Sequence, residues 1–389
     1  MKIEQFTELT LAYWRAYFTR LARAVKNGEI DTGGKTILYP CILLVTSCNG
    51  IFVAELLGAS VKYVGLSLKK SKEPSIYKLL SQFDDSSNAA IFRCDAACNG
   101  FYGVCFARSV DVESVKKRFP NIALYPSGIV IPEGEGSLIE FGKNFRSCSF
   151  ERCVLINKKG DLFRVKSILS MFIVSSSISL SELKFFYNNF ADADEIRSIY
   201  VEESDGCLSV AGQLQNLCLS SGVHETTIGE FIRLHPDIIL RAFSCDSFLY
   251  EKSFPWIKSN YPMEEKEINP DLLLRRKDGF YDICDLKTVA FKCKSLTRGR
   301  TARKRFVDYV HEGIAQLVNY REYFSIPENA EFAFEKFGVK VSDPKLILVV
   351  GSWENAVVED VAKASMNHSG VTIIDYDTFC HLYISGSLT

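Results

Sequence analysis

The chain has 389 residues, of which 47% are hydrophobic and 24% are charged. That balance is typical of a folded protein of two or three domains, and it excludes extensive disorder. The formal net charge is −1, so any site for a polyanion must come from local clustering of basic residues.

Cysteine usage and the amino terminus indicate a cytoplasmic protein. The thirteen cysteines are an odd number, and no pair has the CxxC spacing of a structural zinc site. The first residues lack the charged and then apolar layout of a signal peptide. The most apolar stretch, residues 37–57, contains Pro40 and Asn49-Gly50, which predicts two buried strands around a turn and no membrane span. Because a cytoplasmic location is expected, we also expect the cysteines to be reduced.

The amino-terminal part predicts a mixed α/β domain. Leu11, Trp14, Phe18, Leu21 and Val25 recur at steps of three and four, which predicts an amphipathic helix over residues 4–26. β-rich runs separated by turn residues follow as far as residue 156. The predicted strands are Ile51–Leu57, Val61–Ser67, Ala89–Phe92, Tyr102–Phe106, Ile129–Ile131 and Cys153–Ile156.

Helical patterns follow from about residue 163. Residues 181–190 predict one helix and residues 208–219 predict another. We therefore expect three parts: a mixed α/β domain at 1–160, a helical connector at 161–222, and a further domain at 223–389.

A candidate site lies in a β-hairpin near residues 270–287. Asp271 is followed by an apolar run, and Asp278-Gly279 supplies a hairpin turn. The return strand contains Asp285 and Lys287, which project from one face because side chains alternate along a strand. Antiparallel pairing brings Asp271 toward Asp285, so two carboxylates and one ammonium are expected at one place.

That set of groups suits metal-assisted hydrolysis of a phosphodiester. Mg²⁺ is usually held by one or two carboxylates together with waters and phosphate oxygens. The metal lowers the pKa of a bound water and stabilises charge on the phosphate, and a nearby lysine orients the water or stabilises the transition state. The alternative is a solvated hairpin with surface charges, but Asp285 sits inside an apolar run where an unpaired carboxylate is costly.

A basic segment follows this hairpin and suits the phosphate backbone of DNA. It contains seven basic residues and no acidic residue, so the remainder of the chain is net acidic. Such a segment favours sequence-independent, salt-sensitive phosphate contacts, although a solvated charged loop is the simpler alternative. The basic residues are Lys292, Lys294, Arg298, Arg300, Arg303, Lys304 and Arg305.

Two further residues are candidates for the same site. In the helix predicted at 307–324, Gln316 shares a face with Tyr320 and could hydrogen-bond the attacking water, a phosphate or Lys287. It could equally be a polar residue at a helix edge. Upstream, Glu230 is either a third carboxylate for the metal or the capping-box partner of Thr227 at a helix start.

These segments together resemble the carboxy-terminal domain of Shedu anti-phage proteins. The similarity covers residues 226–385. The motifs that carry it are, in chain order, Glu230-Phe231-Ile232 before His235-Pro236, Pro270-Asp271, Asp285-Leu286-Lys287, Ile314-Ala315-Gln316-Leu317 with Tyr320, the strand Leu346–Gly351, and Ile374–Phe379.

The resemblance implies an α/β (α+β) fold of the restriction-endonuclease-like type, with a mixed sheet flanked by helices. It implies that Asp271 and Asp285, with Glu230 as a less secure third ligand, hold Mg²⁺ or Mn²⁺. Lys287 would be the catalytic lysine and Gln316 a supporting residue. Residue 285 is Asp where Glu is commoner in such sites, which shortens the carboxylate arm and keeps the chemistry.

The function implied is that of a metal-dependent DNA endonuclease, nicking or cleaving phage DNA in prokaryotic anti-phage defence. The resemblance also implies a homo-oligomer, and the part at 1–160 is expected to sense or regulate. Two alternatives stay open: a catalytically silent DNA-binding or assembly protein, and a defence effector that cleaves RNA.

Overall fold

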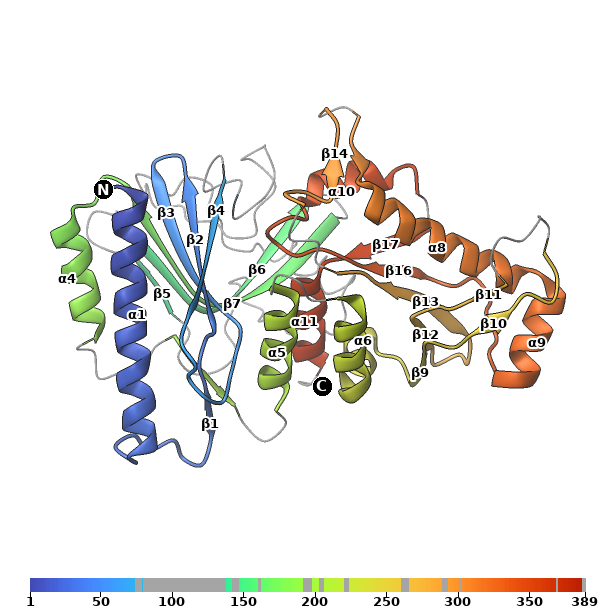
Figure 1. Cartoon of the computed structure of the whole chain (residues 1–389), viewed down its shortest axis with the longest axis horizontal. Coiled ribbons are helices and arrows are strands. Elements are labelled where there is room, and N and C mark those ends of the chain that lie inside the picture. The colour runs from blue at the N-terminus through green and yellow to red at the C-terminus, as the bar shows by residue number, and fades with distance from the viewer. Residues whose placement is uncertain are drawn as a thin grey trace. The chain divides into compact units, whose positions relative to one another are not determined.

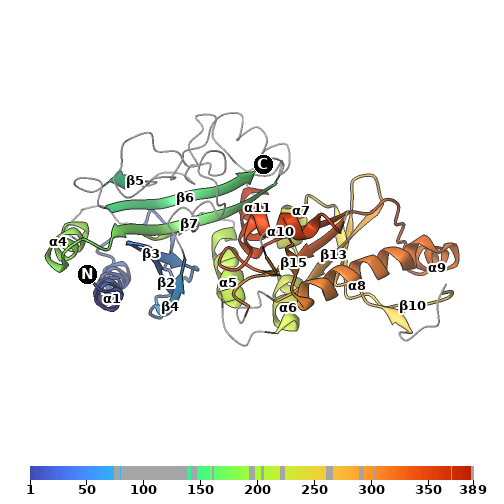
Figure 2. The same cartoon turned by 90° about the horizontal axis from the view of Figure 1, so that it is seen from above.

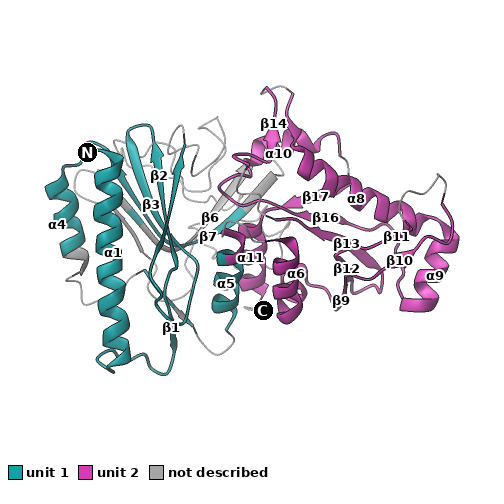
Figure 3. Cartoon of the chain, viewed as in Figure 1, with its two compact units in different colours: residues 1–216 teal, residues 217–389 magenta. Residues whose placement is uncertain are grey.

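A computed structural model describes residues 1–73, 79, 138–141, 147–159, 162–191, 198–202, 206–219, 224–259, 266–288, 293–300, 303–368 and 370–386. The chain divides into two compact units, Met1–Asn216 and Leu217–Thr389 (Figure 3). Each unit contains its own cluster of buried hydrophobic side chains.

The first unit is built on a six-stranded mixed sheet. Only β4 and β2 run parallel, and every other neighbouring pair is antiparallel. In spatial order the strands are β4 (Ser67–Lys72), β2 (Ile42–Cys48), β3 (Ile51–Leu57), β7 (Leu162–Ser175), β6 (Ser147–Lys159) and β5 (Leu138–Phe141).

Helix α1 (Ile3–Lys26) lies against β2 and β3 and beside α4 (Leu180–Ala191), as Figure 1 shows. Its apolar stripe is buried, with Trp14 2% exposed and Phe18 fully buried. The Tyr187 hydroxyl of α4 donates a 2.8 Å hydrogen bond to Thr10 Oγ1 of α1. A small sheet pairs β1 (Thr36–Leu38) with β8 (Tyr200–Glu202), and α5 (Cys207–Leu219) follows.

Several sequence predictions for this unit are confirmed. The helix over 4–26 and the helices near 181–190 and 208–219 are present, and β2 and β3 form the expected hairpin around Gly50. Gly50 has a φ of 74°, which glycine adopts without the strain that a side chain brings.

Other predictions for this unit differ from the structure. A strand at Val61–Ser67 is wrong, because β4 begins only at Ser67. A helical connector beginning at residue 161 is also wrong, because 162–175 is strand β7 and pairs with β3 and β6. The expected boundary at 160 is thus replaced by a division after Asn216. The strands predicted at 89–92, 102–106 and 129–131 lie outside the described residues.

The second unit is built on a five-stranded mixed sheet. β17, β16 and β13 run parallel, whereas β12 is antiparallel to both β13 and β9. In spatial order the strands are β17 (Val371–Ile374), β16 (Leu346–Val349), β13 (Tyr281–Leu286), β12 (Leu272–Arg275) and β9 (Ser247–Tyr250). Every residue of the central strand β13 is buried, as befits a strand with neighbours on both edges.

Helices flank this sheet, so the expected mixed α/β fold is confirmed (Figure 2). α8 (Asp308–Ser325) packs on β13 and β16 through its apolar stripe, while α7 (Asp237–Phe243) packs against β9 and α11 (Tyr376–Gly386). The remaining elements are α6 (Glu225–Leu234), α9 (Pro327–Phe337), α10 (Val358–Ser365) and the two-stranded ribbons β10 (Phe254–Pro255) with β11 (Glu267–Ile268) and β14 (Thr297–Arg298) with β15 (Arg305–Phe306).

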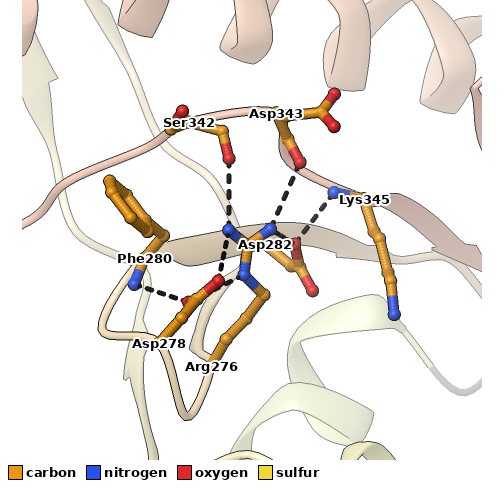
Figure 4. A network of polar contacts seen from close by, with 7 residues as sticks. All are labelled: Arg276, Asp278, Phe280, Asp282, Ser342, Asp343 and Lys345. Atoms are coloured by element: carbon orange, nitrogen blue, oxygen red, sulfur yellow. Dashed lines mark hydrogen bonds and ion pairs between the residues drawn. The ribbon is translucent and has the colours of Figure 1, made fainter.

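An arginine clamp fixes the turn end of the β12–β13 hairpin (Figure 4). The Arg276 guanidinium donates to Asp282 Oδ1 at 3.1 Å and to the carbonyl oxygens of Ser342 and Asp343, both at 3.2 Å. Asp282 Oδ1 also accepts the Lys345 N–H at 2.9 Å, just before β16 begins. The clamp therefore ties the hairpin turn to the segment that sets the register of β16 on β13.

Two further observations concern the described part of the chain as a whole. None of its helices is both long and apolar enough to cross a membrane. No disulfide joins the cysteines that the structure describes.

Candidate active site

The β12–β13 hairpin brings Asp271, Asp285 and Lys287 together. Because Leu272 pairs with Cys284, Asp271 lies across from Asp285 where the two strands meet. Asp271 Oδ2 accepts the Leu286 N–H at 2.7 Å, which anchors the aspartate to the opposite strand. The three residues singled out by the sequence thus occupy one end of this hairpin.

Lys287 is an ammonium held among carboxylates. Its Nζ lies 2.8 Å from Asp285 Oδ2 and 4.0 Å from a carboxylate oxygen of Glu225. Burial by itself lowers the lysine pKa, but the charges of Asp285 and Glu225 outweigh burial, and the pKa is raised above its ordinary value. The raised pKa favours the protonated, cationic form of Lys287.

The two aspartates form a close pair in which Asp285 is buried and Asp271 is half-buried. Asp285 is 1% exposed, and burial followed by the charge of Asp271 raises its pKa to about 7. Burial raises the pKa of Asp271 as well, against the opposing effects of the Leu286 N–H and Lys287. Both shifts disfavour simultaneous ionisation of the two carboxylates, so a proton shared between them is expected.

The donor set fits a hard divalent cation. Asp285 Oδ2 is ion-paired with Lys287 Nζ at 2.8 Å, and the second carboxylate, that of Asp271, lies beside the same pair. No three Asp, Glu, His or Cys side chains among the described residues form a complete ligand cage. Mg²⁺ does not require such a cage, because one or two carboxylates with waters and phosphate oxygens are its usual ligands. Asp271 and Asp285 supply those carboxylates.

Helix α8 lines the site through one face. Gly313 faces Lys287 and β16: a Cβ at this position would lie 3.3 Å from Lys287 Cε and 2.9 Å from Leu348 Cδ1. Gln316 follows one turn later, and its buried Oε1 accepts no hydrogen bond among the described residues. Tyr320 Oη, one further turn along, donates to the carbonyl oxygen of Asn269 at 3.1 Å and so fixes the backbone before Asp271.

The acidic residue of α6 that contacts Lys287 is Glu225, which the sequence patterns did not single out. The structure starts α6 at Glu225, with Thr227 and Glu230 inside the helix, so the capping box expected for that pair is wrong. Glu230 pairs with Arg233 at 2.8 Å, and both side chains are more than half exposed. An acidic residue directly before the Thr226-Thr227 pair was the sequence signal, because acids favour the first turn of a helix.

Tyr309 connects Glu225 to the end of the β12–β13 hairpin. Its hydroxyl donates to Glu225 Oε1, accepts the Thr288 N–H at 2.6 Å and lies 2.8 Å from Thr288 Oγ1. Burial, and then the bond to Glu225, raises the pKa of Tyr309, which keeps the phenol neutral and able to donate. No pattern in the sequence pointed to this tyrosine.

The basic segment forms the ribbon β14–β15 directly before α8. Arg298 pairs with Asp308 and Lys304 pairs with Asp360 at 2.7 Å, so these two cations are already compensated. Four others are exposed and make no ion pair within the described residues: Lys294, Arg300, Arg303 and Arg305. Lys292 lies outside the described residues.

Comparison with known proteins adds little to this geometry. The sequence matches no protein-family model and no curated protein. Among solved structures, a repair endonuclease from Pyrococcus abyssi is similar at 14% identity and a TM-score of 0.17, over 65% of this chain and 76% of that one. A TM-score this low does not establish a shared fold.

Proposed function

We propose that residues 217–389 hydrolyse phosphodiester bonds of DNA with Mg²⁺ or Mn²⁺ held by Asp271 and Asp285. The observation that carries the proposal is the aspartate pair: Asp285 is buried, half-buried Asp271 lies opposite it, and burial and the charge of Asp271 raise the pKa of Asp285 to about 7. Placing two neighbouring carboxylates beside a single ammonium is costly, and a bound cation would offset that cost.

Each residue has a chemical role in this proposal. Asp271 and Asp285 hold the cation, which when bound would polarise the phosphate and lower the pKa of a water. Lys287, kept protonated by its carboxylate neighbours, places a positive charge where the phosphate becomes more negative in the transition state. Gln316 offers a buried acceptor oxygen that can orient the attacking water.

The exposed cations of the β14–β15 ribbon support DNA as the substrate. They lie just before α8, the helix that carries Tyr309, Gly313 and Gln316. Arginines and lysines of this kind bind phosphates without reading sequence, and they tolerate single and double strands alike. Action in anti-phage defence, assembly as a homo-oligomer and regulation by the amino-terminal part rest on the resemblance to Shedu proteins and are proposed on that basis.

The decisive experiment incubates the full chain with supercoiled, linear and single-stranded DNA, and with RNA, under Mg²⁺, Mn²⁺ or EDTA. Asp285→Asn and Lys287→Ala should abolish metal-dependent cleavage while leaving the thermal unfolding midpoint measurable and cooperative. Lys277→Ala, an exposed lysine on the same hairpin, is the matched control and should cut normally.

Three outcomes would redirect the proposal. Cleavage that survives in both site variants would place the chemistry elsewhere. Metal-independent DNA binding without any cleavage by the parent would favour the silent DNA-binding alternative. Cleavage of RNA alone would favour the RNA-cleaving effector. The defence role would be supported if cells carrying the parent protein survive phage challenge and cells carrying Lys287→Ala do not.

A further inference from the structure

The hydroxyl group of Tyr309 has all its hydrogen-bonding capacity in use. A phenol has one proton to donate and two lone pairs to accept with. The proton goes to Glu225 Oε1, and the lone pairs take the Thr288 N–H at 2.6 Å and the Thr288 hydroxyl at 2.8 Å. One side-chain oxygen thus joins three separate elements: α8, α6 and the segment directly after β13.

This arrangement decides where the Glu225 carboxylate points. Glu225 is the first residue of α6 and its side chain is 41% exposed, so water and the amides of its own helix N-terminus compete for the carboxylate. The bond from Tyr309 holds one carboxylate oxygen, which leaves the other 4.0 Å from Lys287 Nζ. Hydrogen bonds to an ionised acceptor are short and strong, so the Tyr309 phenol can hold the Glu225 carboxylate in place of water or the helix amides.

We infer that Tyr309 is a positioning residue, which holds Glu225 against Lys287 and so fixes the lysine ammonium between Glu225 and Asp285. This inference rests on the proposed function for its catalytic meaning, but the positioning itself can be measured on the protein alone. Among the described residues the Tyr309 hydroxyl hydrogen-bonds Glu225 and Thr288 and none of Asp271, Asp285 and Lys287, so its effect on Lys287 passes through Glu225.

A second tyrosine on the same helix supplies a matched control. Tyr323 is buried, and its hydroxyl donates a 3.1 Å hydrogen bond to the carbonyl oxygen of Pro255, far along α8 from Lys287. Tyr323→Phe and Tyr309→Phe each remove one hydroxyl from α8. Only the second removes a group that holds Glu225.

The first test measures how fast Lys287 is acylated in the full chain at one fixed pH, by peptide mass spectrometry. Tyr309→Phe and Glu225→Gln should each accelerate labelling of Lys287 several-fold, and the double variant should show no further increase. Tyr323→Phe should label at the parental rate, and exposed Lys277 should label equally in every protein. The inference would be overturned if Lys287 in Tyr309→Phe is acylated at the parental rate. It would also be overturned if the double variant is acylated faster than either single variant.

Thr288→Ala keeps the inference testable if Tyr309→Phe fails to fold. This change removes one bond to the phenol and leaves the bond from Tyr309 to Glu225 intact. Labelling of Lys287 should then stay near the parental rate while Glu225→Gln still accelerates it. If Thr288→Ala and Glu225→Gln accelerate acylation of Lys287 equally, loosening of the strand end, and not the position of Glu225, would determine the reactivity of Lys287.

The second test uses DNA cleavage. Tyr309→Phe should lower kcat roughly ten- to hundredfold with little change in KM, as expected when a catalytic group is misplaced and not removed. Combining it with Glu225→Gln should add no further loss. If the parent cuts no nucleic acid, the proposed function fails while the labelling result stands, so the two failures are distinguishable.

Discussion

Gly313 of α8 lies directly against the aliphatic chain of Lys287, and a side chain at this position would be crowded by Lys287 and Leu348. A Cβ there would lie 3.3 Å from Lys287 Cε and 2.9 Å from Leu348 Cδ1. Glycine costs helix stability relative to alanine, by roughly 1 kcal/mol in an exposed position. Its presence in the middle of α8 is therefore explained by the close approach of the lysine.

Enlarging residue 313 should displace Lys287. Gly313→Val is expected to lower the rate of cleavage at least as much as Tyr309→Phe does, with Gly313→Ala intermediate, because the methyl groups push Lys287 from Asp285. Initial rates on one DNA substrate check this. Ala315→Val, the same kind of enlargement on the exposed face of α8, should leave the rate unchanged. Full activity in Gly313→Val would show that the position of Lys287 is unimportant.

The raised pKa of Asp285 predicts how stability depends on pH without metal. Its folded-state pKa of about 7 lies above the ordinary 3.8, so folding takes up a proton between these values. The contribution is therefore fully present below pH 3.8 and is lost as the pH rises toward 7. Denaturant titrations across this pH window should show that the free energy of unfolding falls with rising pH in the parent and falls much less in Asp285→Asn. A parental slope that the variant retains would rule out Asp285 as its source.

Bound metal should oppose the loss of folding stability that we expect as the pH rises. Mg²⁺ requires ionised carboxylates, so its binding competes with the shared protons of Asp271 and Asp285. The rise in thermal midpoint on adding a fixed concentration of Mg²⁺ should therefore increase from pH 5.5 toward pH 8. Asp285→Asn should show little rise at any pH, and a pH-independent rise in the parent would contradict the shared-proton account.

The basic ribbon should contribute unequally to DNA binding. Arg300 and Arg303 are exposed and unpaired among the described residues, whereas Arg298 pairs with Asp308. Each phosphate contact contributes about 0.9 to the slope of log K against log salt. Arg300→Ala and Arg303→Ala should each lower that slope by nearly this amount in a fluorescence anisotropy titration. Arg298→Ala should lower it less, and equal effects from all three would mean that the Asp308 pair opens on binding.

The arginine clamp should stabilise the fold without taking part in chemistry. Arg276→Ala removes the donor that joins Asp282 to the loop before β16, so we expect a loss of about 2 kcal/mol in the free energy of unfolding. Urea titration measures that loss. Arg275→Ala, an exposed neighbour, should change stability little, and kcat at low temperature should be retained in both variants.

Local patterns were sufficient to predict the hairpins. Asn49-Gly50 and Asp278-Gly279 each separate two runs of strand-forming residues, and both turns occur in the structure with their glycines at positive φ. Period-two alternation placed Asp285 and Lys287 on one face, and the short hairpin placed Asp271 opposite. These relations depend on residues close together in the chain, which is why the sequence reveals them.

Relations between distant segments could not be predicted in this way. The sequence of β7 does not predict a strand, because nearly all side chains of residues 165–174 are buried on both faces and no alternation of apolar and polar residues results. The sequence predicts a helix start at Thr227, whereas α6 begins two residues earlier, at Glu225. The predicted start favours Glu230 as the acidic residue of the site in place of Glu225. Tyr309 lies 21 positions from Thr288 and 84 positions from Glu225, so no local pattern reveals either contact.

The different spans of these contacts have a consequence for how the site assembles. Asp271 and Leu286 are joined across only 15 residues, so the acidic pair can form as soon as one hairpin closes. The bond from Tyr309 to Glu225 spans 84 residues and must wait for α6 and α8 to dock. A nascent chain would therefore hold its two aspartates together before Glu225 is fixed beside Lys287, which makes the tyrosine contact the final step that completes the site.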